Sequence, residues 1–169
     1  MTESDDRYAF SEATDPPSPL KVPSSSLLPA LAAGLVAALV GGIAWGLIVK
    51  ISNYEVGFVA WGIGFIAGTA VVIAGRGAKG RSLQVIAVLS ALLGILLGKY
   101  LSYAFAVQEE AKSFGASIGL VSGDMFSFFR EDLDSVFGLF DLLWVGFAVF
   151  TAWRIPQVDE SEPASAPVE

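Results

Sequence analysis

The sequence predicts an all-α protein: a four-helix transmembrane bundle with acidic, disordered tails. Hydrophobic residues make up 54% of the 169-residue chain, and charged residues make up only 16%. A soluble domain ordinarily carries about a quarter charged residues. The charges gather near the chain ends and in the loops, which leaves four long apolar runs. Runs of about 18 apolar residues or more are typical of membrane-spanning helices.

The composition argues against several classes of function. A net charge of −7 disfavours nucleic-acid binding, which needs a basic surface to meet phosphate. The chain has no cysteine and no histidine, so it lacks thiolate nucleophiles, the commonest metal ligand and the usual general base. We therefore expect no cofactor, no metal site and no enzymatic activity.

The predicted spans cover about residues 27–49, 56–75, 82–107 and 135–153. The first is free of charged residues and would measure roughly 34 Å as a helix, enough to cross a hydrocarbon core of about 30 Å. Short connections join the first three spans, which makes consecutive helices antiparallel neighbours. The third span is longer than a bilayer requires, so it must tilt or project past the surface.

The tails, residues 1–26 and 156–169, are polar, acidic and proline-containing. Such segments bury too little apolar surface to offset the entropy lost on ordering, so we expect disorder. The first tail is not a signal peptide, because a signal has a short positive region directly before its apolar core.

The longest loop, residues 108–134, includes a short apolar segment from Met125 to Arg130 that Asp124 is placed to cap. The segment suits a short helix lying in the headgroup region. Alternatively, its phenylalanines extend the fourth span outwards.

The distribution of lysine and arginine predicts the orientation. An excess of these residues marks the cytoplasmic face of a membrane protein. The tails and the turn between the second and third spans carry Lys21, Arg76, Lys79, Arg81 and Arg154, whereas the other side carries Lys50, Lys112 and Arg130 among many carboxylates. Both termini are therefore expected in the cytoplasm. Arg76, Lys79 and Arg81 are also candidates for contact with anionic lipid headgroups.

Small residues recur at every fourth position in three spans. This spacing places them on one helix face, where they allow two helix backbones to approach closely. The candidate packing glycines are Gly34, Gly42, Gly46, Gly64, Gly68, Gly94 and Gly98. The pattern does not decide whether these faces pack inside the bundle or mediate a homo-oligomer or contact with a membrane-protein partner.

Two ionisable residues fall within the predicted spans, Lys99 and Asp141. Each costs about 2.5–3.5 kcal/mol at the bilayer centre, so it normally faces the bundle and finds a partner. Lys99 would lie roughly 25 Å and Asp141 roughly 18 Å from the cytoplasmic ends of their helices, close enough to pair. Glu55 competes for Lys99. The alternatives are a structural ion pair, snorkelling of Lys99 to the outer surface, and a proton- or ion-handling site.

One segment carries a family resemblance. The stretch Phe58-Val59-Ala60-Trp61-Gly62-Ile63-Gly64, continued by Gly75-Arg76-Gly77 and Gln84-Val85-Ile86, resembles part of small uncharacterised bacterial multi-pass membrane proteins. It covers about residues 54–101. Some of those proteins carry a zinc-ribbon or B-box-like head, which this chain cannot form without cysteine or histidine. The resemblance implies a bacterial inner-membrane protein and supplies no activity.

Two hypotheses of function follow. The first is a non-enzymatic membrane subunit that works by packing against partners or against itself. The second is a small transport or channel component in which Lys99, Asp141 and Glu55 line a polar path. A conduit requires a polar cavity reaching both faces, whereas a structural subunit requires a dry, packed bundle.

Overall fold

The computed structural model describes residues 24–54 and 57–158. Within these ranges the chain forms α-helices and no strand, which confirms the predicted all-α class. Of the predicted tails 1–26 and 156–169, residues 1–23 and 159–169 lie outside the described residues. Residues 24–26 instead begin the first helix, and Pro156 is buried, so these parts of the tail prediction are wrong. The helices are α1 (Ser24–Ser52), α2 (Phe58–Ala74), α3 (Arg81–Ser113), α4 (Gly123–Glu131), α5 (Leu133–Val136) and α6 (Leu139–Arg154).

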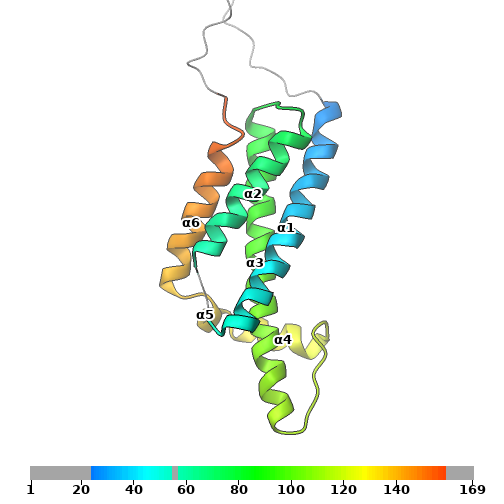
Figure 1. Cartoon of the computed structure of the whole chain (residues 1–169), viewed down its shortest axis with the longest axis vertical. Helices are drawn as coiled ribbons and strands as arrows, with labels where there is room; N and C mark the ends of the chain where they lie inside the picture. The colour runs from blue at the N-terminus through cyan, green and yellow to red at the C-terminus, as the bar shows by residue number, and fades with distance from the viewer. Residues whose placement is uncertain (1–23, 55–56, 159–169) are drawn as a thin grey trace, which may run out of the picture.

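Four helices, α1, α2, α3 and α6, run side by side as a bundle (Figure 1). Helix α3 contacts the other three, and α2 contacts both α1 and α6. The start of α1, the α2–α3 turn and the end of α6 lie together at what we call the turn end. The short helices α4 and α5 lie towards the opposite end, the loop end, past which α3 projects.

The bundle contains two long and two short helices. Helices α1 and α3 have 29 and 33 residues and are long and apolar enough to cross a membrane, judged by length and composition. They measure about 44 and 50 Å at the α-helical rise. Helix α2 has 17 residues and α6 has 16, so each measures only about 25 Å.

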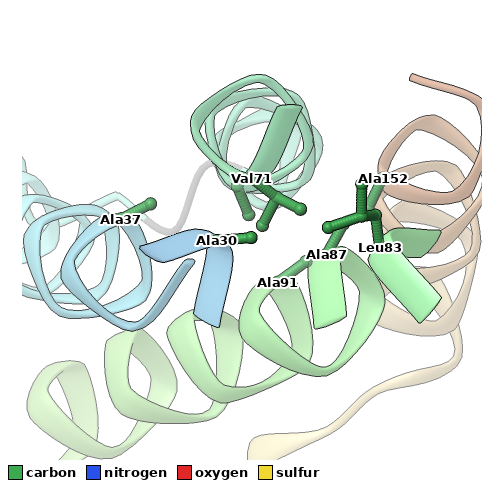
Figure 2. Close-up of a cluster of buried hydrophobic side chains, with 8 residues drawn as sticks. Ala30, Ala37, Val71, Leu83, Ala87, Ala91 and Ala152 are labelled. Carbon is green, nitrogen blue, oxygen red and sulfur yellow. The ribbon is translucent and has the colours of Figure 1, made fainter. Parts of the chain in front are cut away.

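The interior of the bundle is built from small side chains. Figure 2 shows one cluster in which alanines of α1, α3 and α6 surround Val71 of α2 and Leu83 of α3. Large apolar side chains instead point outwards from all four helices, as do Leu39, Phe65, Leu93 and Phe147. A second buried cluster contains Trp45, Ile63 and Ile95, so the interior mixes small side chains with a few large ones, while many large apolar side chains face the surroundings.

Glycines set the distance between α1 and α3. A methyl group on Gly94 would lie 3.1 Å from the Cα of Ala38, and one on Gly42 would lie 2.8 Å from the carbonyl oxygen of Gly94. Real Cβ atoms almost never approach other atoms so closely. The two backbones are thus in direct contact, which only the absence of a side chain permits. Gly34, Gly46 and Gly98 meet Ser90, Leu101 and Trp45 along the same interface.

A second close contact joins α2 to α6. A methyl group on Gly64 would lie 2.7 Å from the Cα of Ala148, and Gly68 packs on Ala152 and Ile155. All seven glycines singled out in the sequence thus face helices of their own chain. A second copy of the chain, or a partner protein, would therefore have to contact residues other than these seven glycines.

The α2–α3 turn is closed by backbone hydrogen bonds. The amide of Gly77 donates to the carbonyl of Val72, and the amide of Arg76 donates to that of Ile73. This pattern ends a helix with one left-handed residue, here Arg76 at φ 59°, where glycine is usual. The turn also docks on α6, because the Gly80 amide donates to the carbonyl of Pro156 at 2.9 Å.

The loop end differs from expectation at its helix boundaries. The third helix does not stop near residue 107 but continues to Ser113, because polar residues from Gln108 onward can continue a helix outside an apolar environment. The fourth long helix begins at Leu139, not near residue 135. Extended backbone at Phe137 and Gly138 breaks the chain there, and residues 133–136 form the separate turn α5.

Helix α4 is a separate element rather than an extension of the fourth span. Its N-cap is Ser122, whose hydroxyl accepts from the amide of Met125 at 3.1 Å, and not the expected Asp124. Phe129 is buried and makes edge-on ring contacts with Tyr100 and Tyr103 of α3. Aromatic packing therefore holds α4 against the projecting part of α3.

We predict that Gly64→Ala destabilises the bundle by roughly 1–3 kcal/mol, because the new methyl group collides with the backbone of α6. Gly62→Ala is the matched control on the same helix, since a methyl group there meets nothing within 4 Å. It should be neutral or stabilise by roughly 0.5–1 kcal/mol through helix propensity. Denaturant unfolding in detergent micelles, followed by circular dichroism, measures both. Equal effects of the two variants would contradict the interface.

We also predict that Phe129→Ala releases α4 from α3. Loss of a buried phenylalanine costs about 3 kcal/mol of local docking energy. Hydrogen–deuterium exchange should accelerate across residues 114–137 and stay unchanged in the bundle. Phe126→Ala is the control, because Phe126 is 58% exposed and Phe129 only 5%. Equal acceleration in both variants would show that α4 is not held by this contact.

Candidate functional site

The most unusual buried side chain in the bundle is Lys99 of α3. It is 1% exposed, although lysine is almost never fully buried without a partner. It follows Gly98 and continues the buried face of α3 that includes Ile95. Its amine lies 5.6 Å from the ring centre of Phe137 and 5.9 Å from that of Trp45, within the range of cation–π attraction.

The structure brings Lys99 and Asp141 together, as the sequence predicted. The Nζ atom lies 2.9 Å from Oδ1 of Asp141 and donates a hydrogen bond of 3.0 Å to the carbonyl oxygen of Val136. The third candidate, Glu55, lies outside the described residues. Because Lys99 is buried, its amine does not reach the outer surface, which excludes the snorkelling alternative.

Asp141 occupies the first turn of α6, not the interior of a span. The break at Gly138 moves the start of the helix, so Asp141 becomes its third residue. Its Oδ2 accepts from the amide of Gly138 at 2.9 Å, and its own amide donates to the carbonyl of Gly138 at 3.0 Å. A carboxylate at this position caps the helix and meets the positive end of the helix dipole. Asp141 thus needs no ion partner to be favourable there.

Lys99 joins three elements at one point. Val136 is the last residue of α5, and its carbonyl is one of those that a helix end leaves unpaired. Asp141 stands at the start of α6. The amine of Lys99 therefore links α3 to the end of one helix and the beginning of the next, and fixes the connection between them. This arrangement is that of a structural staple.

The surroundings of the pair are apolar towards the turn end. The buried polar side chains of the described residues are Ser26, Gln84, Ser90, Lys99 and Ser102, and Lys99 is the only ionisable one among them. Gln84, near the turn end, donates to the carbonyl of Trp153 at 3.1 Å and so caps the last turn of α6. The described interior thus offers no relay of titratable groups from Lys99 to the turn end.

Sequence reasoning missed two contributors to the site. The first is the backbone carbonyl of Val136. Every residue has such a carbonyl, so the residue type at position 136 did not indicate this contact. Trp45 is fully buried against Gly98, and its indole Nε1 has no hydrogen-bond partner. The sequence did indicate that Trp45 could be buried. It lies beside the small-residue face of the first span, where a large side chain can fill the space left by a glycine on the facing helix.

The basic turn lies apart from this site. Arg76, Lys79 and Arg81 are exposed in and beside the α2–α3 turn. Lys99 instead contacts Val136 of α5 and Asp141 at the start of α6. Within residues 24–54 and 57–158 no group of three or more histidine, cysteine, aspartate or glutamate side chains is placed to hold a metal ion. Comparisons with protein families, curated proteins and solved structures found no match.

We predict that Asp141→Asn destabilises the protein by roughly 3 kcal/mol, because a buried amine loses its carboxylate. The figure is at the low end for buried pairs, since Asp141 is 19% exposed. Asparagine preserves the cap at Gly138, so the change isolates the charge. Adding Lys99→Met to this variant should recover much of the loss. Unfolding of the two single variants and the double variant gives the coupling energy, and purely additive effects would contradict a structural pair.

An exchange of the two residues tests the same site differently. Lysine at position 141 lacks an oxygen to cap Gly138 and meets the positive end of the helix dipole. Lys99→Asp combined with Asp141→Lys should therefore restore stability only in part. Full restoration would show that the cap contributes little.

Proposed function

We propose that this protein is a four-span integral membrane protein that acts without catalysis, by packing against other membrane components. The observation that carries the membrane assignment is the distribution of side-chain size. Alanine and glycine make up much of the interior, beside a few large residues such as Trp45 and Ile63, and many large apolar residues lie on the outside of α1, α2, α3 and α6. In water such a surface would favour aggregation. In lipid it is solvated, and small interior residues let helices associate closely.

Helix lengths support α1 and α3 as spans directly, and α2 and α6 as spans of a thinner region of the bilayer. Helices α1 and α3 exceed the thickness of a hydrocarbon core, and the shorter α2 and α6 are accommodated by local thinning of the bilayer. The turn end carries Arg76, Lys79 and Arg81, which favours the cytoplasmic face of a bacterial inner membrane for that end. Helix α4 then lies at the outer headgroup region, with Phe126 exposed towards the acyl chains.

The site favours a structural role over a conduit. Lys99 is paired with a carboxylate and a carbonyl, and the interior towards the turn end is packed with alanine. A proton or ion path would need titratable or polar groups continuing through that region. The chain therefore acts as a rigid unit, and the contacts that define its role are made by its outer faces.

The outer faces of α1 and α6 are the best candidates for a partner, because each of these helices packs against two helices of the bundle, whereas α2 and α3 each pack against three. Both carry continuous large apolar side chains, and the glycine faces are already used inside the chain. Leu35, Leu39 and Ile43 represent the face of α1, and Leu143, Phe147 and Phe150 represent that of α6. A partner helix would pack on one of these two rows.

We predict that the protein resists alkaline carbonate extraction and is released only by detergent. Reporter fusions should place residue 78 in the α2–α3 turn and residue 158 after α6 in the cytoplasm, and residue 117 in the outer loop on the opposite side. Release by carbonate would contradict the membrane assignment. Residues 78 and 117 on the same side would contradict four spans.

Photo-crosslinking in native membranes identifies the partner face. A photoreactive residue at position 39 samples α1, and one at position 147 samples α6. We expect a discrete crosslinked protein, or a crosslinked dimer, from one position and not from the other. Only diffuse lipid adducts at both positions would contradict a packing role.

A further inference from the structure

The small-residue face of α1 ends in a charged residue. Small residues recur from Ala30 to Gly46 at every fourth position, and Lys50 takes the next place in the series. The facing series on α3 continues with Ser102 and Ala106, which remain small. The two small-residue faces therefore no longer pack closely at the loop end, because α1 places the long side chain of Lys50 there and the facing series on α3 places only small side chains.

A groove opens at this place. It has a volume of about 400 Å³, within the range of small-molecule sites, and lies between the last turn of α1 and α3. Its apolar lining is Val49, Phe105 and Ala106, and its polar lining is Lys50, Asn53, Ser102 and Glu109. Such a groove suits a ligand that carries one negative charge, one positive charge and an apolar part.

The charged groups are open to a ligand. The Lys50 amine lies over the ring of Phe105, 4.6 Å from its centre, and keeps its donors for an anion. The carboxylate of Glu109 lies 4.0 Å from the Lys112 amine, and both side chains are mostly exposed. Exposed pairs at such a distance contribute little, so Glu109 can accept from another cation. The Ser102 hydroxyl already donates to the carbonyl of Gly98 and keeps its lone pairs.

We propose that this groove binds the headgroup of a phosphatidylethanolamine molecule of the outer leaflet. Lys50 binds the phosphate, Glu109 accepts hydrogen bonds from the ethanolamine ammonium, and Val49 and Ala106 contact the glycerol region. The inference rests on the proposed membrane function, because the bilayer supplies the ligand. The end of α1 then lies at headgroup depth, where the phosphate of a lipid is found.

The same groups discriminate between lipid classes. A choline headgroup has no N–H to donate to Glu109, and quaternary ammonium groups are instead recognised by free aromatic faces. The face of Phe105 is occupied by Lys50. A glycerol headgroup carries no positive charge for Glu109. Ethanolamine is therefore the headgroup that satisfies both charges of the groove.

The test is a lipid titration of the purified full chain in detergent micelles, followed by native mass spectrometry. The probes are phosphatidylethanolamine, phosphatidylcholine and phosphatidylglycerol with identical short acyl chains. We expect phosphatidylethanolamine to bind about fivefold more tightly than phosphatidylcholine, since only the ethanolamine ammonium has N–H groups that can donate hydrogen bonds to the Glu109 carboxylate. Equal binding of these two, or tighter binding of phosphatidylglycerol, would overturn the proposal.

Three exposed positions assign the effect to the groove. Lys50→Gln should weaken the binding of phosphatidylethanolamine about fivefold. Glu109→Gln should abolish the preference over phosphatidylcholine. Arg130→Gln, which removes an exposed charge of α4 outside the groove lining, should change neither. An effect of Arg130→Gln as large as that of Lys50→Gln would show non-specific attraction and overturn the site.

Glycerophosphoethanolamine separates the lipid from a soluble ligand. It should bind at least tenfold more weakly than the lipid, because it lacks the acyl chains. Equal binding would overturn the membrane source and point to a free phosphoethanolamine compound. Carbonate extraction tests the membrane assignment independently of lipid binding. If the protein stays in the membrane but shows no lipid preference, the groove proposal is wrong and the membrane assignment stands.

Discussion

Direct backbone contact between helices is the constraint on which the rest of the structure depends. Helices α1 and α3 meet at Gly42 and Gly94, and α2 and α6 meet at Gly64 and Ala148. At these contact points no side chain larger than alanine fits between the helices, so alanine and glycine line the contacts, while a few large residues such as Trp45 and Ile63 are buried beside them and many others point outwards. Many large apolar side chains therefore lie on the outside of the bundle, which is the observation behind the proposed membrane setting.

The same close packing explains the buried lysine and the groove. Gly98 leaves room for the Trp45 indole beside it, and the Lys99 stem follows into a position that water does not reach. Burial obliges the amine to find acceptors, and the ends of α5 and α6 supply a carbonyl and a carboxylate. One turn past Gly46 the small residues of α1 run out at Lys50, and the interface opens. The buried amine of Lys99 thus has its acceptors within the chain, whereas the exposed charges of Lys50 and Glu109 can contact a ligand.

Much of the loop end could not be read from the chain. The apolar residues Val136 and Phe137 looked continuous with the fourth span, yet the backbone is extended at Phe137 and Gly138. Gly138 before an apolar run is compatible with a helix start. It is also compatible with the middle of a membrane helix, where glycine is frequent, so the sequence did not decide between the two. The cap of α4 was misplaced by two residues for a similar reason, because Ser122 and Asp124 are both good caps and only the local backbone chooses between them.

The sequence by itself determined the helical class, the order and approximate extent of the four bundle helices and the glycine faces, and it named Asp141 as one of the candidate partners of Lys99. These follow from composition and periodicity, which act through local backbone geometry and through the cost of a charge in an apolar interior. Only the tertiary structure decided that the glycine faces pack within one chain, that Asp141 caps α6, that Val136 shares Lys99, and that α1 and α3 separate at Lys50. Each of these depends on where a second helix lies, and residues distant in the chain set that position.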